Sequence, residues 1–136
     1  MARAHAMKLI YEWEMGGDGG EETRLNLLEV RPDEKYADFM NRMFEGVVAN
    51  VEAIDAKLTP FLKGWTIDRM TRVDLAILRL ATYELMLGET PPGVVISEAV
   101  ELANQYSTDK AGGFINGVLG NLGRSMDGDG TASEGT

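Results

Sequence analysis

The chain has 136 residues, no cysteine and a formal net charge of -9, and 44% of its residues are hydrophobic. This length and apolar content predict one globular domain with a continuous core. The absence of cysteine excludes a disulfide framework, a thiolate zinc site and a thiol nucleophile. The first residues lack the apolar run of a signal peptide, and no stretch reaches the length of a membrane span. We therefore expect a cytoplasmic protein with no membrane contact.

The acidic residues are unevenly distributed along the chain. They concentrate in residues 17–38 and 123–136, whereas residues 1–16 and 63–90 are each neutral. A net negative charge argues against nucleic-acid binding, because phosphate contacts supply much of the affinity for RNA. The neutral segments nevertheless permit a modest basic surface, if their cations converge in the fold.

Helical signals dominate the first half of the sequence. Apolar residues at helical spacing predict a helix over residues 2–15, which the glycine-rich run 16–20 ends. A short second helix is predicted over residues 21–30, ending before Pro32. A long third helix is predicted over residues 33–62, with Pro60 near its end.

The second half begins with a break at residues 64–66 and one predicted turn over residues 67–70. Thr71 to Asp74 has the form of a capping box, and this predicts that a helix begins near Arg72 and continues to Leu87. The Pro91-Pro92-Gly93 turn then precedes a helix to about Tyr106.

A last helix is predicted over residues 108–122, where the large apolar residues become sparse. Residues 123–136 are mostly Gly, Asp, Ser, Thr and Glu, so too little burial is available there to offset the entropy of ordering. The predicted organisation is a helical domain over residues 1–122 and a disordered, acidic, glycine-rich tail over residues 123–136.

Catalysis has little support in the sequence. His5 is the only histidine, and it lies near the N-terminus with no second histidine or cysteine to form a metal site or a nucleophile pair. We therefore predict no catalytic residue, no metal site and no cofactor, and we do not expect an enzyme.

Three residues near apolar helix faces each allow two interpretations. Arg79 and Glu84 lie on the most apolar helix, where an unpaired charge would be costly, so each needs a partner. An internal ion pair is favoured over direct contact with a ligand. Phe114 lies one residue before the core position Ile115, about 100° around the helix, so it could pack in the core or stack on a base at the edge of the apolar face.

Two motifs in the second half identify a family resemblance. The first is the helix Val73-Asp74-Leu75-Ala76-Ile77-Leu78-Arg79-Leu80-Ala81-Thr82-Tyr83-Glu84-Leu85, and the second is Ile96-Ser97-Glu98-Ala99-Val100-Glu101-Leu102-Ala103 followed by Phe114-Ile115-Asn116-Gly117-Val118-Leu119. In this order and spacing, the sequence resembles the NusB family. The resemblance implies an all-α, NusB-like bundle of about six to seven helices in two packed halves, near residues 1–62 and 63–122.

The NusB resemblance implies a function in transcription antitermination without enzymatic activity. NusB proteins pair with NusE, a small ribosomal subunit protein, on the boxA RNA of ribosomal RNA leader transcripts, and the complex helps RNA polymerase to resist termination. The resemblance implies RNA contacts at Arg3, Tyr11 and Phe114, and charge adds Lys8, Arg69, Arg72 and Lys110 as phosphate-binding candidates. It implies a partner contact at Asp74, with Tyr83 and Glu84 as weaker candidates.

Alternatives remain open beside this function. The chain could be a homodimeric helical interaction module without RNA binding. RNA 5-methylcytosine methyltransferases also carry a NusB-like domain, but here no cofactor motif follows it. At the N-terminus only Arg3 stands where relatives have several arginines, so either the protein starts further upstream or its own RNA contact is weaker.

Overall fold

A computed structural model describes residues 2–16 and 34–135 of the chain. Within these ranges it contains six α-helices, two short 3-10 turns and no strand, which confirms the predicted all-α class. The helices are α1 (Ala2–Glu14), α3 (Glu34–Ala49), α4 (Val51–Leu58), α5 (Arg72–Leu87), α6 (Pro92–Tyr106) and α7 (Ala111–Gly135), and the turns are η1 (Thr59–Phe61) and η2 (Ile67–Arg69).

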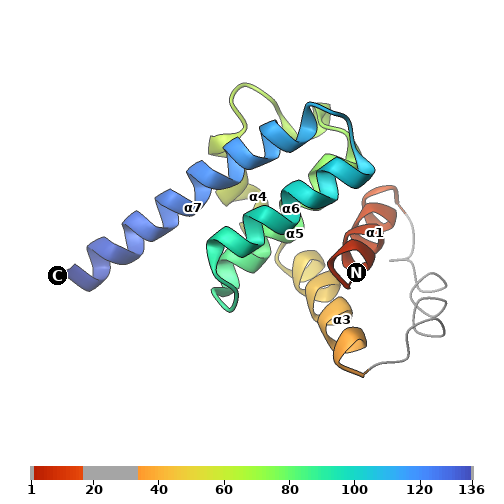
Figure 1. The fold of residues 1–136 in the computed structure, drawn as a ribbon, viewed down its shortest axis with the longest axis horizontal. Coiled ribbons are helices and arrows are strands. Elements are labelled where there is room, and N and C mark those ends of the chain that lie inside the picture. Colours follow the sequence, from red (N-terminus) through yellow and green to blue (C-terminus); the bar gives the residue numbers. More distant parts are fainter. Residues whose placement is uncertain (1, 17–33, 136) are drawn as a thin grey trace.

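Helix α5 is the centre of the bundle (Figure 1). It packs against α1, α3, α4, α6 and α7, and ten of its residues are buried. Helices α1 and α3 also pack on each other, as do α6 and α7. A helix that is apolar on most of its circumference is stable only when neighbours surround it. The two predicted halves therefore meet on α5.

Both ends of α5 lie where the sequence predicts them. The Thr71 hydroxyl accepts a hydrogen bond from the backbone N–H of Asp74 at 3.2 Å, which satisfies one free donor of the first turn. At the other end, Gly88 adopts a left-handed conformation with φ 67°, and its N–H bonds to the carbonyl of Glu84. Glycine adopts this conformation without steric cost, so the helix ends there.

The predicted single helix over residues 33–62 is wrong at Asn50, where the structure separates α3 from α4. Asn50 leaves the helical region with φ -117° and ψ 19°. Its side-chain amide donates to the carbonyl of Gly46 at 2.8 Å, and its backbone N–H donates to the same oxygen at 3.0 Å. An asparagine that bonds the local backbone in this way competes with helix continuation. Apolar periodicity continues through the break, which explains why it was not predicted.

Helix α7 starts three residues later than predicted, at Ala111, and extends to Gly135. Leu122 and Gly123 are buried, and Met126 packs half-buried against the core. The disordered tail over residues 123–136 stays a prediction, and the predicted helix over residues 21–30 falls outside the described residues. In the described ranges, no helix combines the length and the apolar character that crossing a membrane requires.

Candidate nucleic-acid interface

A hollow of about 360 Å³ lies where the start of α5 meets the start of α7. It brings together the RNA-binding candidates Arg69, Lys110 and Phe114 and the partner-binding candidate Asp74. These residues are separated by up to 45 positions in the sequence, so the fold creates the cluster. The full lining is Trp65, Arg69, Met70, Thr71, Asp74, Thr108, Lys110, Ala111 and Phe114.

Two aromatic rings form one part of the hollow. Trp65 and Phe114 lie with ring centroids 6.5 Å apart and an interplanar angle of 65°, an edge-to-face arrangement. Phe114 is half-buried, whereas Trp65 is 53% exposed. Phe114 packs against the core and also lines the hollow, and its predicted role in base stacking stays a prediction.

The Asp74 carboxylate is held by α6 and not by its own capping box. Its Oδ1 accepts a hydrogen bond from the hydroxyl of Ser107 at 2.6 Å, just beyond the end of α6. This contact joins the start of α5 to the end of α6. Asp74 is half-buried and keeps its carboxylate at the edge of the hollow.

The side chains of Arg69, Lys110, Arg72 and Lys8 are all exposed. Arg69 and Lys110 line the hollow, and Arg72 is the first residue of α5. Lys8, on α1, lies with its Nζ 5.1 Å from the centre of the Tyr106 ring, at the end of α6. Tyr106 is itself 40% exposed, so a cation and an aromatic ring meet at the surface there as well.

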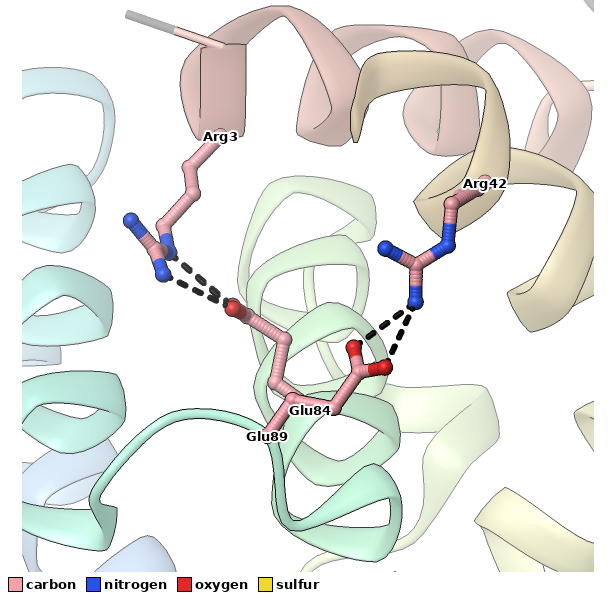
Figure 2. A network of polar contacts seen from close by, with 4 residues as sticks. All are labelled: Arg3, Arg42, Glu84 and Glu89. Carbon is pink, nitrogen blue, oxygen red and sulfur yellow. Dashed lines mark hydrogen bonds and ion pairs between the residues drawn. The ribbon is translucent and has the colours of Figure 1, made fainter. Parts of the chain in front are cut away.

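Arg3 and Glu84, predicted for RNA and partner binding respectively, form an ion pair with each other (Figure 2). The Arg3 guanidinium lies 3.0 Å from the Glu84 carboxylate, and it also stacks over the Phe39 ring at 5.1 Å. Glu84 is only 5% exposed. Nearby, Arg42 of α3 pairs with Glu89 at 2.7 Å, but both of those side chains are exposed. The first pair therefore joins α1 to α5 in a partly buried environment.

The two tyrosine candidates are half-buried and pack against the core. Tyr11 lies on α1, and Tyr83 lies on α5 against Gly46 of α3. Tyr83 and Glu84 are nine and ten residues beyond Asp74, about 14 Å along the helix axis. The structure therefore does not bring the three partner-binding candidates together in one patch.

Arg79 binds two carboxylates, and this confirms the internal ion pair favoured from the sequence. Its guanidinium lies 2.8 Å from Asp55 of α4 and 3.1 Å from Glu14 of α1. Burial raises the pKa of Glu14 to about 7, although the charges of Arg79 and Arg72 act to lower it. The second oxygen of Glu14, Oε2, has no hydrogen-bond partner in the described part of the chain, so ionisation of this carboxyl is only partly compensated.

Sequence reasoning missed Trp65 and Tyr106 as members of this surface. The pattern at residues 64–66 indicates only a break between helices, yet an aromatic residue in a glycine-containing turn has no helix face on which to be buried. That feature could have indicated an exposed ring. No group of three or more His, Asp or Glu side chains suited to a metal ion occurs among the residues that the structure describes.

Comparison with known proteins places this arrangement in a family. A sequence model of the NusB family matches residues 1–124. The chain belongs to the NusB family. Transcription antitermination protein NusB of Acetivibrio thermocellus is 45% identical over 123 residues, which cover 89% of this chain and 85% of the relative. The NusB of Clostridium botulinum (strain Kyoto / Type A2) is 40% identical over 137 residues, which cover 89% of this chain and 96% of the relative.

Solved NusB structures have the same fold. T. maritima NusB superposes with a TM-score of 0.82 at 32% identity, covering 90% of this chain and 88% of that one. A crystal structure of the antitermination factors NusB and NusE in complex with double-stranded RNA superposes with a TM-score of 0.80 at 29% identity, covering 91% and 94%. As a member of the NusB family, this chain is a transcription antitermination factor.

Proposed function

We propose that this NusB-family chain binds single-stranded RNA jointly with NusE, through the surface around the start of α5. The observation that carries the proposal is the convergence of Arg69, Lys110 and Phe114 on one hollow. Exposed cations beside an aromatic ring are the combination that binds single-stranded nucleic acid, because the cations meet phosphates and the ring stacks on a base. A relative was crystallised with NusE and double-stranded RNA, which supports RNA as the class of ligand and NusE as the partner.

Each side chain of this surface has a distinct role in the proposal. Arg69, Lys110, Arg72 and Lys8 would contact phosphates, and Phe114 would stack on a base. Tyr11 would support the surface from α1. Arg3 and Glu84 are left out of the contact surface, because their charges already neutralise each other. Four phosphate contacts on single-stranded RNA correspond to a salt dependence of at most about -3 in log K against log salt concentration.

Because acidic residues are in excess, RNA binding by this chain needs a surface that it shares with a basic partner. With a net charge of -9, the chain repels the RNA backbone outside the basic surface. A basic ribosomal protein such as NusE, docked near Asp74, would add positive charge and further RNA contacts. Asp74 suits this role because it lies at the edge of the hollow and remains half-buried. Tyr83 is a more distant partner contact.

Fluorescence anisotropy with labelled boxA RNA tests the proposal at physiological salt concentration. The chain and NusE together should bind at least tenfold more tightly than either protein alone, and a scrambled RNA should bind weakly. Charge-removing variants Arg69→Gln and Lys110→Gln should each weaken binding and reduce the salt slope by about 0.7. Lys57→Gln on α4, a solvent-exposed cation outside the lining of the hollow, is the matched control.

Two outcomes would contradict this function. Tight, sequence-selective binding by the chain alone would remove the need for a composite surface. No gain on adding NusE would favour the alternative, a homodimeric module without RNA binding, which sedimentation analysis would detect. In the proposed function the protein acts in the cytoplasm, where its RNA-bound complex joins a transcribing RNA polymerase.

A further inference from the structure

We infer that Trp65 is a second base-stacking residue, and that Trp65 and Phe114 together hold one unstacked nucleobase in the hollow. The inference rests on the proposed function and extends it. It adds a residue that the sequence did not suggest, and it specifies the state of the RNA that this site accepts. A duplex keeps its bases stacked inside, so only a single-stranded or flipped nucleotide could enter.

The exposure of Trp65 is the first observation. Trp65 is 53% exposed and leaves apolar surface in water, although the Phe114 ring lies only 6.5 Å away. The interplanar angle of 65° means that the two rings form walls of a corner and do not cover each other. A flat base can stack on one ring and meet the edge of the other, which is a favourable aromatic arrangement.

The turn before Trp65 fixes the backbone from which the ring projects. Lys63 has φ 52° and Gly64 has φ 89°, so two consecutive residues adopt the left-handed region. The N–H of Trp65 donates to the carbonyl of Leu62 at 3.1 Å and closes the turn. For a non-glycine residue such as Lys63 this conformation is uncommon and costs free energy. The backbone that carries the ring is thus preorganised, which reduces the ordering entropy lost when a base binds.

The charges around the hollow orient a nucleotide. Arg69 and Lys110 attract a phosphate, whereas the Asp74 carboxylate repels it. A nucleotide would therefore place its phosphate near the two cations and its base toward the rings. The volume of about 360 Å³ lies in the range of small-molecule sites, about 300–1,000 Å³, and suits a single nucleotide.

Affinity measurements on the complete chain with NusE test the role of Trp65. Trp65→Leu, which keeps apolar bulk but removes the aromatic face, should weaken binding of single-stranded boxA RNA by about 5- to 100-fold. Trp65→Phe should retain most of the affinity, within about threefold. Binding of a duplex RNA should change little in either variant. Val94→Ala is the matched control, because Val94 is also an exposed apolar residue and lies about 18 Å along α6 from Tyr106.

A spectroscopic readout separates stacking from a merely structural role. The chain has two tryptophans, Trp13 and Trp65, so Trp13→Phe leaves Trp65 as the sole tryptophan fluorophore. Its emission should be quenched when single-stranded RNA binds, and the quenching should disappear in high salt together with binding. The reciprocal variant Trp65→Phe keeps Trp13, which is half-buried near Arg79, and should show no quenching. The melting temperature of Trp65→Leu should stay within about 2 °C of wild type, as for other exposed positions.

The outcomes distinguish this inference from the proposed function. If the wild-type pair binds RNA and Trp65→Leu binds equally well, the stacking role is refuted while the proposed function stands. If Trp65→Leu instead weakens association with NusE in the absence of RNA, the hollow is a protein contact and the inference is wrong. If the wild-type pair does not bind RNA at all, both fall together.

Discussion

The phenol ring of Tyr83 occupies the space that a Cβ atom would need on Gly46. Helix α3 can approach α5 at this point only because Gly46 has no side chain. An added methyl group would meet ring atoms of Tyr83, so either the ring or the helix would have to move. The contact explains why a residue of low helix propensity lies in the interior of α3.

Gly46→Ala should therefore destabilise the protein by about 1–3 kcal/mol, the usual cost of overpacking. Helix propensity alone would give the opposite sign. Gly113→Ala in α7 is the matched control, because a Cβ there would meet nothing within 4 Å. That variant should gain up to about 1 kcal/mol. Urea unfolding of both variants measures the difference, and a neutral or stabilising Gly46→Ala would show that the ring yields freely.

The Glu14 carboxyl makes stability depend on pH. Burial raises its pKa from 4.5 to about 7, so the folded state binds the proton more tightly than the unfolded chain. The resulting stabilisation is fully present below about pH 4.5 and is lost as the pH rises through 7. Its upper limit is about 3 kcal/mol.

Glu14→Gln imitates the protonated carboxyl and should remove this dependence. The variant should match wild type near pH 5 and exceed it by about 1–3 kcal/mol at pH 8.5. Arg79 retains Asp55 as its partner in the variant. Chemical unfolding at several pH values provides the measurement. A variant less stable than wild type at pH 8.5 would mean that the Arg79 contact outweighs the burial of the charge.

The Arg3–Glu84 pair should respond unequally to loss of its two members. Arg3→Met leaves the nearly fully buried Glu84 carboxylate without its partner, so we expect a loss of about 3 kcal/mol. Glu84→Gln leaves an arginine that is 24% exposed and can reach water, and should cost only about 1 kcal/mol. A double-mutant cycle then gives the coupling. Equal losses for the two single variants would contradict the asymmetry in burial.

Phe114→Ala should weaken RNA binding by about 1–3 kcal/mol, the contribution of one base stack. Its effect on stability should be smaller than the 3–5 kcal/mol typical of a core phenylalanine, because the ring is half-buried. Ile115→Ala is the opposite control, since Ile115 is fully buried and should lose stability without changing the affinity of the folded protein. A destabilised Phe114→Ala with unchanged RNA affinity would rule out stacking.

Truncation after Met126 should leave the melting temperature almost unchanged. The composition beyond this point provides little apolar surface, and among the side chains that the structure describes, Met126 is the last one packed against the core. Truncation after Asn121 should destabilise the protein, because it removes the buried Leu122 together with Met126. Calorimetry of both truncated chains tests where folding ends, and a large loss in the first would show that the tail packs.

The sequence predicted the elements whose local chemistry and apolar pattern agree. Helix α5 was predicted with both ends correct, because the Thr71 cap and the Pro91-Pro92-Gly93 turn lie on either side of the apolar periodicity. The break at Asn50 was missed because apolar periodicity continues across it. The helix ends there because the Asn50 side-chain amide bonds to the carbonyl of Gly46. A single asparagine in a sequence does not indicate whether its side chain will form such a bond.

The candidate site was harder to predict because it depends on contacts between distant segments. Charge indicated Arg69 and Lys110, and the family resemblance indicated Phe114, but periodicity could not reveal that one hollow joins them. Arg3 carries a charge suited to phosphate, yet the fold pairs it with a carboxylate 81 positions away. Trp65 was overlooked because its position depends on two left-handed residues, one of which is not glycine.

The two ion pairs between α1 and α5 determine the direction in which α1 packs on the bundle. Its cation, Arg3, comes first along the helix and its buried anion, Glu14, comes last, whereas on α5 the cation Arg79 precedes the anion Glu84. Opposite charges meet because α1 and α5 run in opposite directions, so that Arg3 lies beside Glu84 and Glu14 lies beside Arg79. If α1 docked the other way round, arginine would face arginine and glutamate would face glutamate in a partly buried seam, where like charges are unfavourable. These four charged residues thus select one orientation of the first helix on the bundle.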